Sequence, residues 1–72
     1  MIHIGKAIEE ELHTQERSVA WFARKLCCDR TNVYNIFRRK SIDTDQLLRI
    51  SKILGRNFFL LFCDEINRST VE

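Results

Sequence analysis

The 72-residue chain contains no proline and only two glycines, whereas 44% of its residues are hydrophobic. Disordered chains are poor in apolar residues, so this composition excludes them and supports a folded core. Without proline, no position is barred from a helix interior. The composition therefore favours a compact all-helical bundle, close to the lower size limit for a core that has no disulfide or metal.

Long hydrophobic runs are also missing. The longest unbroken apolar stretch covers residues 58–63, far short of the roughly 20 residues that a membrane-spanning helix needs. Residues 1–12 carry four charged side chains and lack the apolar segment of a signal peptide. We therefore expect a cytoplasmic protein that has no membrane partner.

The cysteines give no sign of a metal or redox site. Cys27, Cys28 and Cys63 cannot all pair within one chain, and no C-x-x-C spacing occurs. Combined with His3 and His13 they fit no common zinc spacing, so we interpret them as small apolar residues of a reduced protein. A nucleophile–base set and a glycine-rich phosphate loop are also missing. We expect no enzyme, no cofactor and no metal.

Acidic residues are almost absent from one part of the chain. Residues 17–40 carry seven basic side chains and one acidic one, a net charge of +6, whereas residues 1–16 carry −3 and residues 41–72 carry −1. The net charge of +2 for the whole chain hides this separation. A positive region of this kind attracts the phosphate backbone of nucleic acids.

Hydrophobic periodicity predicts two short helices within this basic stretch. Apolar residues recur at helical spacing in two runs, formed by Val19, Phe22, Ala23 and Leu26 and by Val33, Ile36 and Phe37. Ser18 and Asp29 stand before the two runs, where their oxygens can cap the helices. Cys27 and Cys28 leave room for only a tight turn. Two amphipathic helices joined in this way match a helix-turn-helix motif.

Two further helices are predicted on either side of this motif. The first spans about residues 3–15. Its apolar side chains repeat along one face: Ile4, Ile8 and Leu12. The fourth helix follows Asp43, which forms a capping box with Gln46 reaching back to it. Gly55 supplies the left-handed position that ends the fourth helix.

A short fifth helix is predicted from residue 58 to about residue 66, capped by Asn57. The polar residues 67–72 are expected to form a frayed tail. The predicted fold is therefore all-α, with five helices in a single domain of residues 1–66.

The third helix, about residues 30–39, is predicted to turn a wholly polar face outward. This face carries Arg30, Thr31, Tyr34, Asn35 and Arg38, with Asn32 at its margin. It has no aspartate or glutamate, which solvated helix faces usually contain. A solvated face remains the alternative, but the composition favours contact with DNA.

Residues from about 4 to 62 resemble the phage-repressor and Cro-like helix-turn-helix domain, the XRE family. The matching residues read I-G-x-x-I in the first helix, S-x-x-x-F-A-x-K-L in the second, N-V-x-x-I in the third and L-L-R-I-S-K-I-L-G in the fourth. The resemblance implies a lambda-repressor-like five-helix bundle. It also implies a sequence-specific transcriptional regulator of double-stranded DNA that places its third helix in the major groove.

Carried over by position, the resemblance assigns two sets of DNA contacts. Base reading falls to Arg30, Thr31, Asn32 and Asn35. Arginine can fork onto guanine and asparagine can pair with adenine, each contact giving about 1–3 kcal/mol of discrimination. Phosphate contacts fall to Ser18, Tyr34, Arg38, Arg39 and Lys40.

The chain departs from the family pattern at three places. Val19 replaces a glutamine that often contacts a phosphate, and Cys27 replaces a glycine of the turn. If Cys27 keeps the left-handed conformation, it costs about 1–2 kcal/mol, and otherwise the turn has a different shape. Leu12 and Phe37 occupy the positions of a common arginine–glutamate pair, so we expect an apolar contact there.

The fifth helix indicates an interaction surface. Phe59 and Leu60 lie off the inward stripe formed by residues 58, 61 and 62. We expect a homodimer that presents two recognition helices about 34 Å apart to a pseudo-palindromic site. Alternatively, the two side chains close the base of the monomer core. The alternative function is a protein-interaction module, such as an antitoxin or regulatory subunit, that binds a protein partner through this apolar surface.

Overall fold

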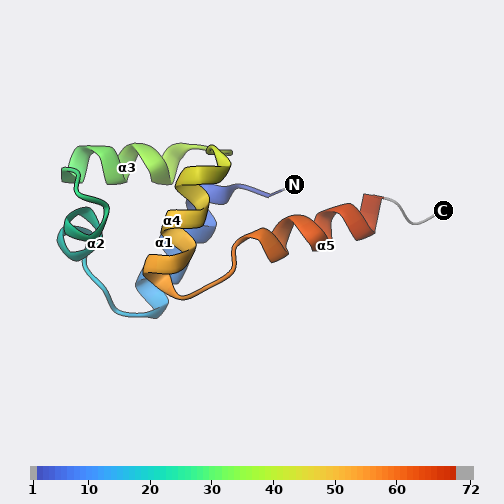
Figure 1. Ribbon diagram of the computed structural model, residues 1–72, viewed down its shortest axis with the longest axis horizontal. Coiled ribbons are helices and arrows are strands. Elements are labelled where there is room, and N and C mark those ends of the chain that lie inside the picture. The colour runs from blue at the N-terminus through green and yellow to red at the C-terminus, as the bar shows by residue number, and fades with distance from the viewer. Residues whose placement is uncertain (1, 70–72) are drawn as a thin grey trace.

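The computed structural model describes residues 2–69, which form five α-helices and no β-strand (Figure 1). The helices are α1 (Ile4–Thr14), α2 (Val19–Leu26), α3 (Arg30–Arg38), α4 (Thr44–Leu54) and α5 (Phe59–Ser69). The predicted all-helical architecture is confirmed, and the first four helices begin and end close to the predicted positions. Within residues 2–69, no helix combines the length and the apolar character required to cross a membrane.

The helix α3 packs against both α1 and α2, and α4 lies alongside α1 (Figure 1). The last helix, α5, leaves this four-helix bundle and projects to one side (Figure 1). The molecule is therefore elongated, with dimensions of 44 × 20 × 19 Å.

One hydrophobic core joins the four packed helices to the start of the fifth. Its buried side chains are Ile4, Ile8, Leu12, Phe22, Ala23, Leu26, Val33, Ile36, Phe37, Leu47, Ile50, Leu54 and Phe58. The predicted inward stripes of α1 and α3 are confirmed, and α4 buries Leu47, Ile50 and Leu54. In α2 the stripe is complete except that Val19 is only half-buried. Among the side chains of residues 2–67, none that is polar or charged is buried.

The start of α1 is joined to the end of α3 through the backbone. The N–H groups of Ile4 and Gly5 donate to the carbonyls of Lys40 and Arg39, at 3.1 and 2.9 Å. The next two N–H groups of α1 donate to Nδ1 and to the carbonyl of His3. The N–H groups of Ile4, Gly5 and Lys6, which have no carbonyl acceptor within the helix, therefore all have partners. The role of His3 was not predicted, because histidine is not a usual N-cap.

Only glycine fits at the crossing of α1 and α3. A Cβ atom at Gly5 would collide with three backbone carbonyls, those of Ile36, Phe37 and Arg39. The I-G-x-x-I pattern of the first helix therefore has a packing cause in this fold.

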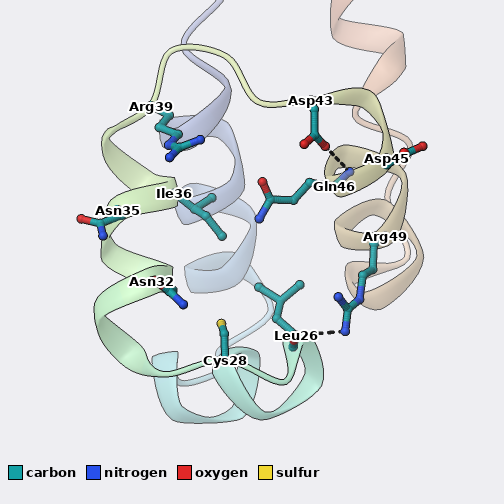
Figure 2. A pocket seen from close by; sticks show the side chains of 10 residues that line it. All are labelled: Leu26, Cys28, Asn32, Asn35, Ile36, Arg39, Asp43, Asp45, Gln46 and Arg49. Carbon is teal, nitrogen blue, oxygen red and sulfur yellow. Dashed lines mark hydrogen bonds between the residues drawn. The ribbon is translucent and has the colours of Figure 1, made fainter.

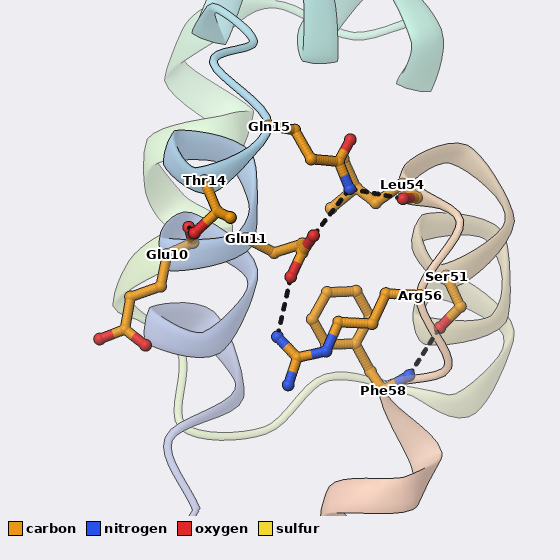
Figure 3. A network of polar contacts seen from close by, with 8 residues as sticks. All are labelled: Glu10, Glu11, Thr14, Gln15, Ser51, Leu54, Arg56 and Phe58. Carbon is orange, nitrogen blue, oxygen red and sulfur yellow. Dashed lines mark hydrogen bonds and ion pairs between the residues drawn. The ribbon is translucent and has the colours of Figure 1, made fainter.

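A polar network fixes the segment between α4 and α5 against α1 (Figure 3). The Gln15 side chain donates to the Leu54 carbonyl at 2.6 Å and to a Glu11 carboxylate oxygen at 2.8 Å. The other Glu11 oxygen pairs with the Arg56 guanidinium at 3.0 Å. That guanidinium also lies over the buried Phe58 ring, 5.2 Å from its centroid. These contacts hold the base of α5 on the bundle.

The fifth helix differs from the prediction at both ends. It begins at Phe59, where the Asn57 side chain accepts from the Phe59 N–H at 3.0 Å, as expected of a cap. It continues to Ser69, three residues beyond the predicted end at about residue 66. Polar residues alone do not stop a helix, and neither glycine nor proline follows Ile66. Residues 70–72 lie outside the described part of the chain.

The Gly5 crossing leads to a stability prediction. Gly5→Ala should lower the stability by about 2–3 kcal/mol, because the new methyl group meets backbone carbonyls that cannot swing away. Gly55→Ala is the matched control. Gly55 has open space around it, so an alanine there would meet no other atom. That substitution costs only the strain of placing a side chain at the left-handed φ of +68°, about 1–2 kcal/mol. Thermal unfolding of both variants measures the difference, and a Gly5→Ala midpoint at or above that of Gly55→Ala would contradict the account.

The burial of Leu12 leads to a second prediction. Leu12 is 0% exposed and shares the core with Phe37, consistent with an apolar contact in place of an ion pair. Leu12→Arg should cost about 3–5 kcal/mol, since the buried charge would have no carboxylate partner. His13→Arg places the same charge on the adjacent exposed position and should change stability by less than about 0.5 kcal/mol. A Leu12→Arg melting temperature near that of the parent would disprove the apolar pairing.

Candidate nucleic-acid interface

The turn between α2 and α3 has the left-handed shape that the family pattern implies. Cys27 has φ 58° and ψ 44°, and its N–H donates to the Arg24 carbonyl. The N–H of Cys28 donates to the Ala23 carbonyl at 3.0 Å, which completes the helix cap. Of the two conformations considered for this turn, the structure has the left-handed one, and it strains the cysteine.

Three predicted N-caps set the starts of the helices around this turn. Ser18 accepts from the Trp21 N–H at 3.0 Å and Asp29 accepts from the Asn32 N–H at 3.0 Å. Asp43 accepts from the Gln46 N–H at 2.6 Å. These caps are confirmed, and they define where α2, α3 and α4 begin.

The outward face of α3 is solvent-exposed, as predicted. The exposed residues are Arg30, Thr31, Asn32, Tyr34, Asn35 and Arg38, followed in the loop by Arg39 and Lys40. Val33, Ile36 and Phe37 hold the opposite side of the helix in the core. Tyr34 stands edge-on against Phe37, with ring centroids 6.1 Å apart. Every candidate for base reading is therefore exposed on α3, a helix that has no carboxylate of its own.

The candidate phosphate contacts divide between two places. Tyr34, Arg38, Arg39 and Lys40 lie on α3 or directly after it, whereas Ser18 lies at the N-terminus of α2. Ser18 is exposed even though its oxygen caps the helix. A duplex would have to touch both places at once to use all five residues.

An open cleft of about 470 Å³ separates the α3 face from α4 (Figure 2). Asn32 and Gln46 point into it from opposite walls, over a floor that includes Ile36, whereas Asn35 points outward (Figure 2). Gln46 therefore does not reach back to Asp43, and the second half of the predicted capping box was wrong. Its side chain extends across the cleft toward Ile36 instead, leaving its amide available to a ligand.

One contact braces the turn from α4. The Arg49 guanidinium donates to the Leu26 carbonyl at 3.0 Å and so satisfies a free carbonyl at the end of α2 (Figure 2). Cys28 lies beside this contact, where burial raises the pKa of its thiol and the Asp29 carboxylate raises it further. The sequence offered no signal for the Arg49 contact, because the two residues are 23 positions apart.

The outer side of α2 carries an aromatic ring between two cations. The Arg17 guanidinium lies 4.6 Å from the centroid of the Trp21 ring, and the Lys25 ammonium lies 5.8 Å from it. Trp21 is half-buried and packs against the core. The i, i+4 spacing of the three residues is the signal that would have found this arrangement.

Metal chemistry has no support in the described residues. Within residues 2–69, no group of three or more histidine, cysteine or acidic side chains is placed to hold an ion. The three cysteines are free thiols.

No protein-family model matches the chain, and comparisons with curated proteins and with solved structures give no match either. The assignment of a function therefore depends on the geometry of this chain alone.

The strained turn leads to a prediction for two cysteine-to-glycine substitutions, one of which should raise the stability and the other lower it. Cys27→Gly should stabilise the protein by about 1 kcal/mol, because glycine adopts the left-handed conformation without a Cβ clash. The same substitution at Cys63, which is exposed within α5, should destabilise by about 0.5–1 kcal/mol. Thermal unfolding of the two variants tests the conformation, and a loss of stability in Cys27→Gly would contradict it.

Proposed function

We propose that the chain is a sequence-specific DNA-binding transcriptional regulator of the phage-repressor and Cro-like helix-turn-helix family, acting in the cytoplasm. The observation that supports this most strongly is the outward face of α3. It is exposed, rich in arginine and asparagine, and free of carboxylates, while three buried side chains fix its orientation. The arrangement of α2, the tight turn and α3 fits a helix-turn-helix, in which the second helix enters the major groove.

In this proposal the start of α3 reads the bases. Arg30 and Thr31 stand at its first turn, and Asn35 follows one turn later on the outward side. A guanidinium can donate two hydrogen bonds to guanine, and a carboxamide can both donate to and accept from adenine. Asn32 points into the cleft beside Gln46, so it would contact a base or a strand that enters the cleft.

Phosphates would be held on both sides of the reading helix. Ser18 and the N-terminal N–H groups of α2 face one backbone, since helix N-termini attract phosphate. Arg38, Arg39 and Lys40 would hold the other backbone at the end of α3. The net charge of +6 on residues 17–40 would draw the duplex toward this side of the molecule.

A second candidate function has one observation in its favour. Leu60 is 58% exposed on α5, and this helix projects from the bundle (Figure 1). An apolar surface of this kind suits a protein-interaction module, such as an antitoxin or regulatory subunit. It also suits the expected homodimer, in which two α3 helices would bind one pseudo-palindromic site.

Two variants separate base reading from phosphate binding. Bound sites are first selected from random DNA, and affinities for the selected and altered sites are then measured at several salt concentrations. Arg30→Ala should relax the preference at one base position at a cost of about 1–3 kcal/mol, because its fork specifies a base. Lys40→Ala should weaken all sequences about equally and lower the salt slope by about one.

The two variants control for each other, since each removes one positive charge. Uniform loss of affinity in both would show that Arg30 does not read a base. A stable 1:1 complex with another protein, without salt-sensitive DNA binding, would support the second candidate function instead.

A further inference from the structure

Among residues 59–67 of the fifth helix, no side chain is fully buried. An isolated helix of about 11 residues is marginal in water, so most of its stability has to come from packing against other groups. Full burial ends at the base of α5, where Phe58 is 0% exposed, although Phe59, Leu61 and Phe62 still pack against the core. Phe59, Leu61 and Phe62 are half-buried, and Leu60 is 58% exposed. Leu60 therefore presents apolar surface that the bundle does not cover, on a helix that projects from the bundle (Figure 1).

A groove on α4 lies open on the same molecule. It is lined by Leu48, Lys52, Gly55 and Phe59 among others, and it has a volume of about 480 Å³. Leu48 is 47% exposed there. The α5 helix of the same chain forms one edge of the groove through Phe59 and then runs away from the bundle.

The exposed side of α5 and the groove carry matching side chains at matching spacing. On α4, Lys52 follows Leu48 by one helical turn, and on α5, Asp64 follows Leu60 by one helical turn. Among the side chains of residues 2–67, neither Lys52 nor Asp64 has an ion-pair partner, although both are exposed. A helix carrying Leu60 and Asp64 can therefore place a leucine on Leu48 and a carboxylate against Lys52.

We propose that the α5 arm of each chain docks in the α4 groove of a second copy of the same chain. A two-fold axis lets the two arms exchange, so both grooves and both arms are covered at once. This inference names the partner of the α5 surface. It rests on the proposed DNA-binding function only for its consequence, two α3 helices on one duplex.

Sedimentation equilibrium of the purified full chain, without DNA, tests the docking. The parent should be a dimer at about 10–100 μM, the micromolar range of modest interfaces. The Leu60→Asp variant should be monomeric at the same concentrations, because docking would bury a carboxylate in the apolar groove. Leu60 is exposed in the single chain, so this variant should keep its helical content and melting temperature, except for any part that dimerisation adds. Glu10→Lys, on the exposed side of α1, should remain a dimer.

Charge reversal then tests the register. Lys52→Glu and Asp64→Lys should each weaken the dimer about 3- to 10-fold, since each juxtaposes like charges at the interface rim. The double variant restores an opposite-charge pair and should recover to within about 3-fold of the parent.

Three results would overturn the inference: a monomeric parent, a Leu60→Asp variant that is still a dimer, or a double variant as weak as the single ones. A complex of α5 with a different protein, in the absence of self-association, would also overturn it. Because no DNA is present, a failure here leaves the reading role of α3 intact. Equally, a failure of the DNA selection leaves the dimer unaffected.

Discussion

The close crossing of α1 and α3 at Gly5 is the constraint on which the rest of the structure depends. Two N–H groups of α1 donate to the carbonyls that follow α3, so the start of one helix satisfies the end of the other. The missing Cβ allows the backbones to meet at this distance. With its C-terminal end tied to α1 and its apolar side in the core, α3 has one orientation. That orientation turns Arg30, Thr31 and Asn35 toward solvent.

The basic and acidic residues also lie mostly on different helices. Helix α3, its loop and the outer side of α2 carry most of the basic residues, whereas the glutamates of α1 serve structural contacts or face solvent. Glu11, for example, joins Arg56 and Gln15 in the network that holds the base of α5. A molecule divided in this way can approach a duplex with one side and leave α5 free to meet a partner.

Local signals in the sequence were sufficient for most of the fold. Apolar spacing placed the helices and the core, and side-chain caps such as Ser18 and Asp29 placed the helix starts, because both depend on residues a few positions apart. Features set by distant contacts were missed. Gln46 points into a cleft that exists only once α3 and α4 are packed, and Arg49 reaches a carbonyl 23 positions away. The projection of α5 was missed for the same reason, since nothing within that helix shows how little of it the bundle covers.

The exposed polar face of α3 is the part of the molecule from which the proposed function follows, and the proposed contact with DNA can be tested residue by residue. The most direct measurement is a nuclear magnetic resonance titration of the isotope-labelled chain with a selected duplex. Backbone amide shifts should change most along residues 30–40 and at the N-terminus of α2, and least on the glutamate side of α1. Shifts that concentrate elsewhere, or that do not change at all at moderate salt, would contradict the account.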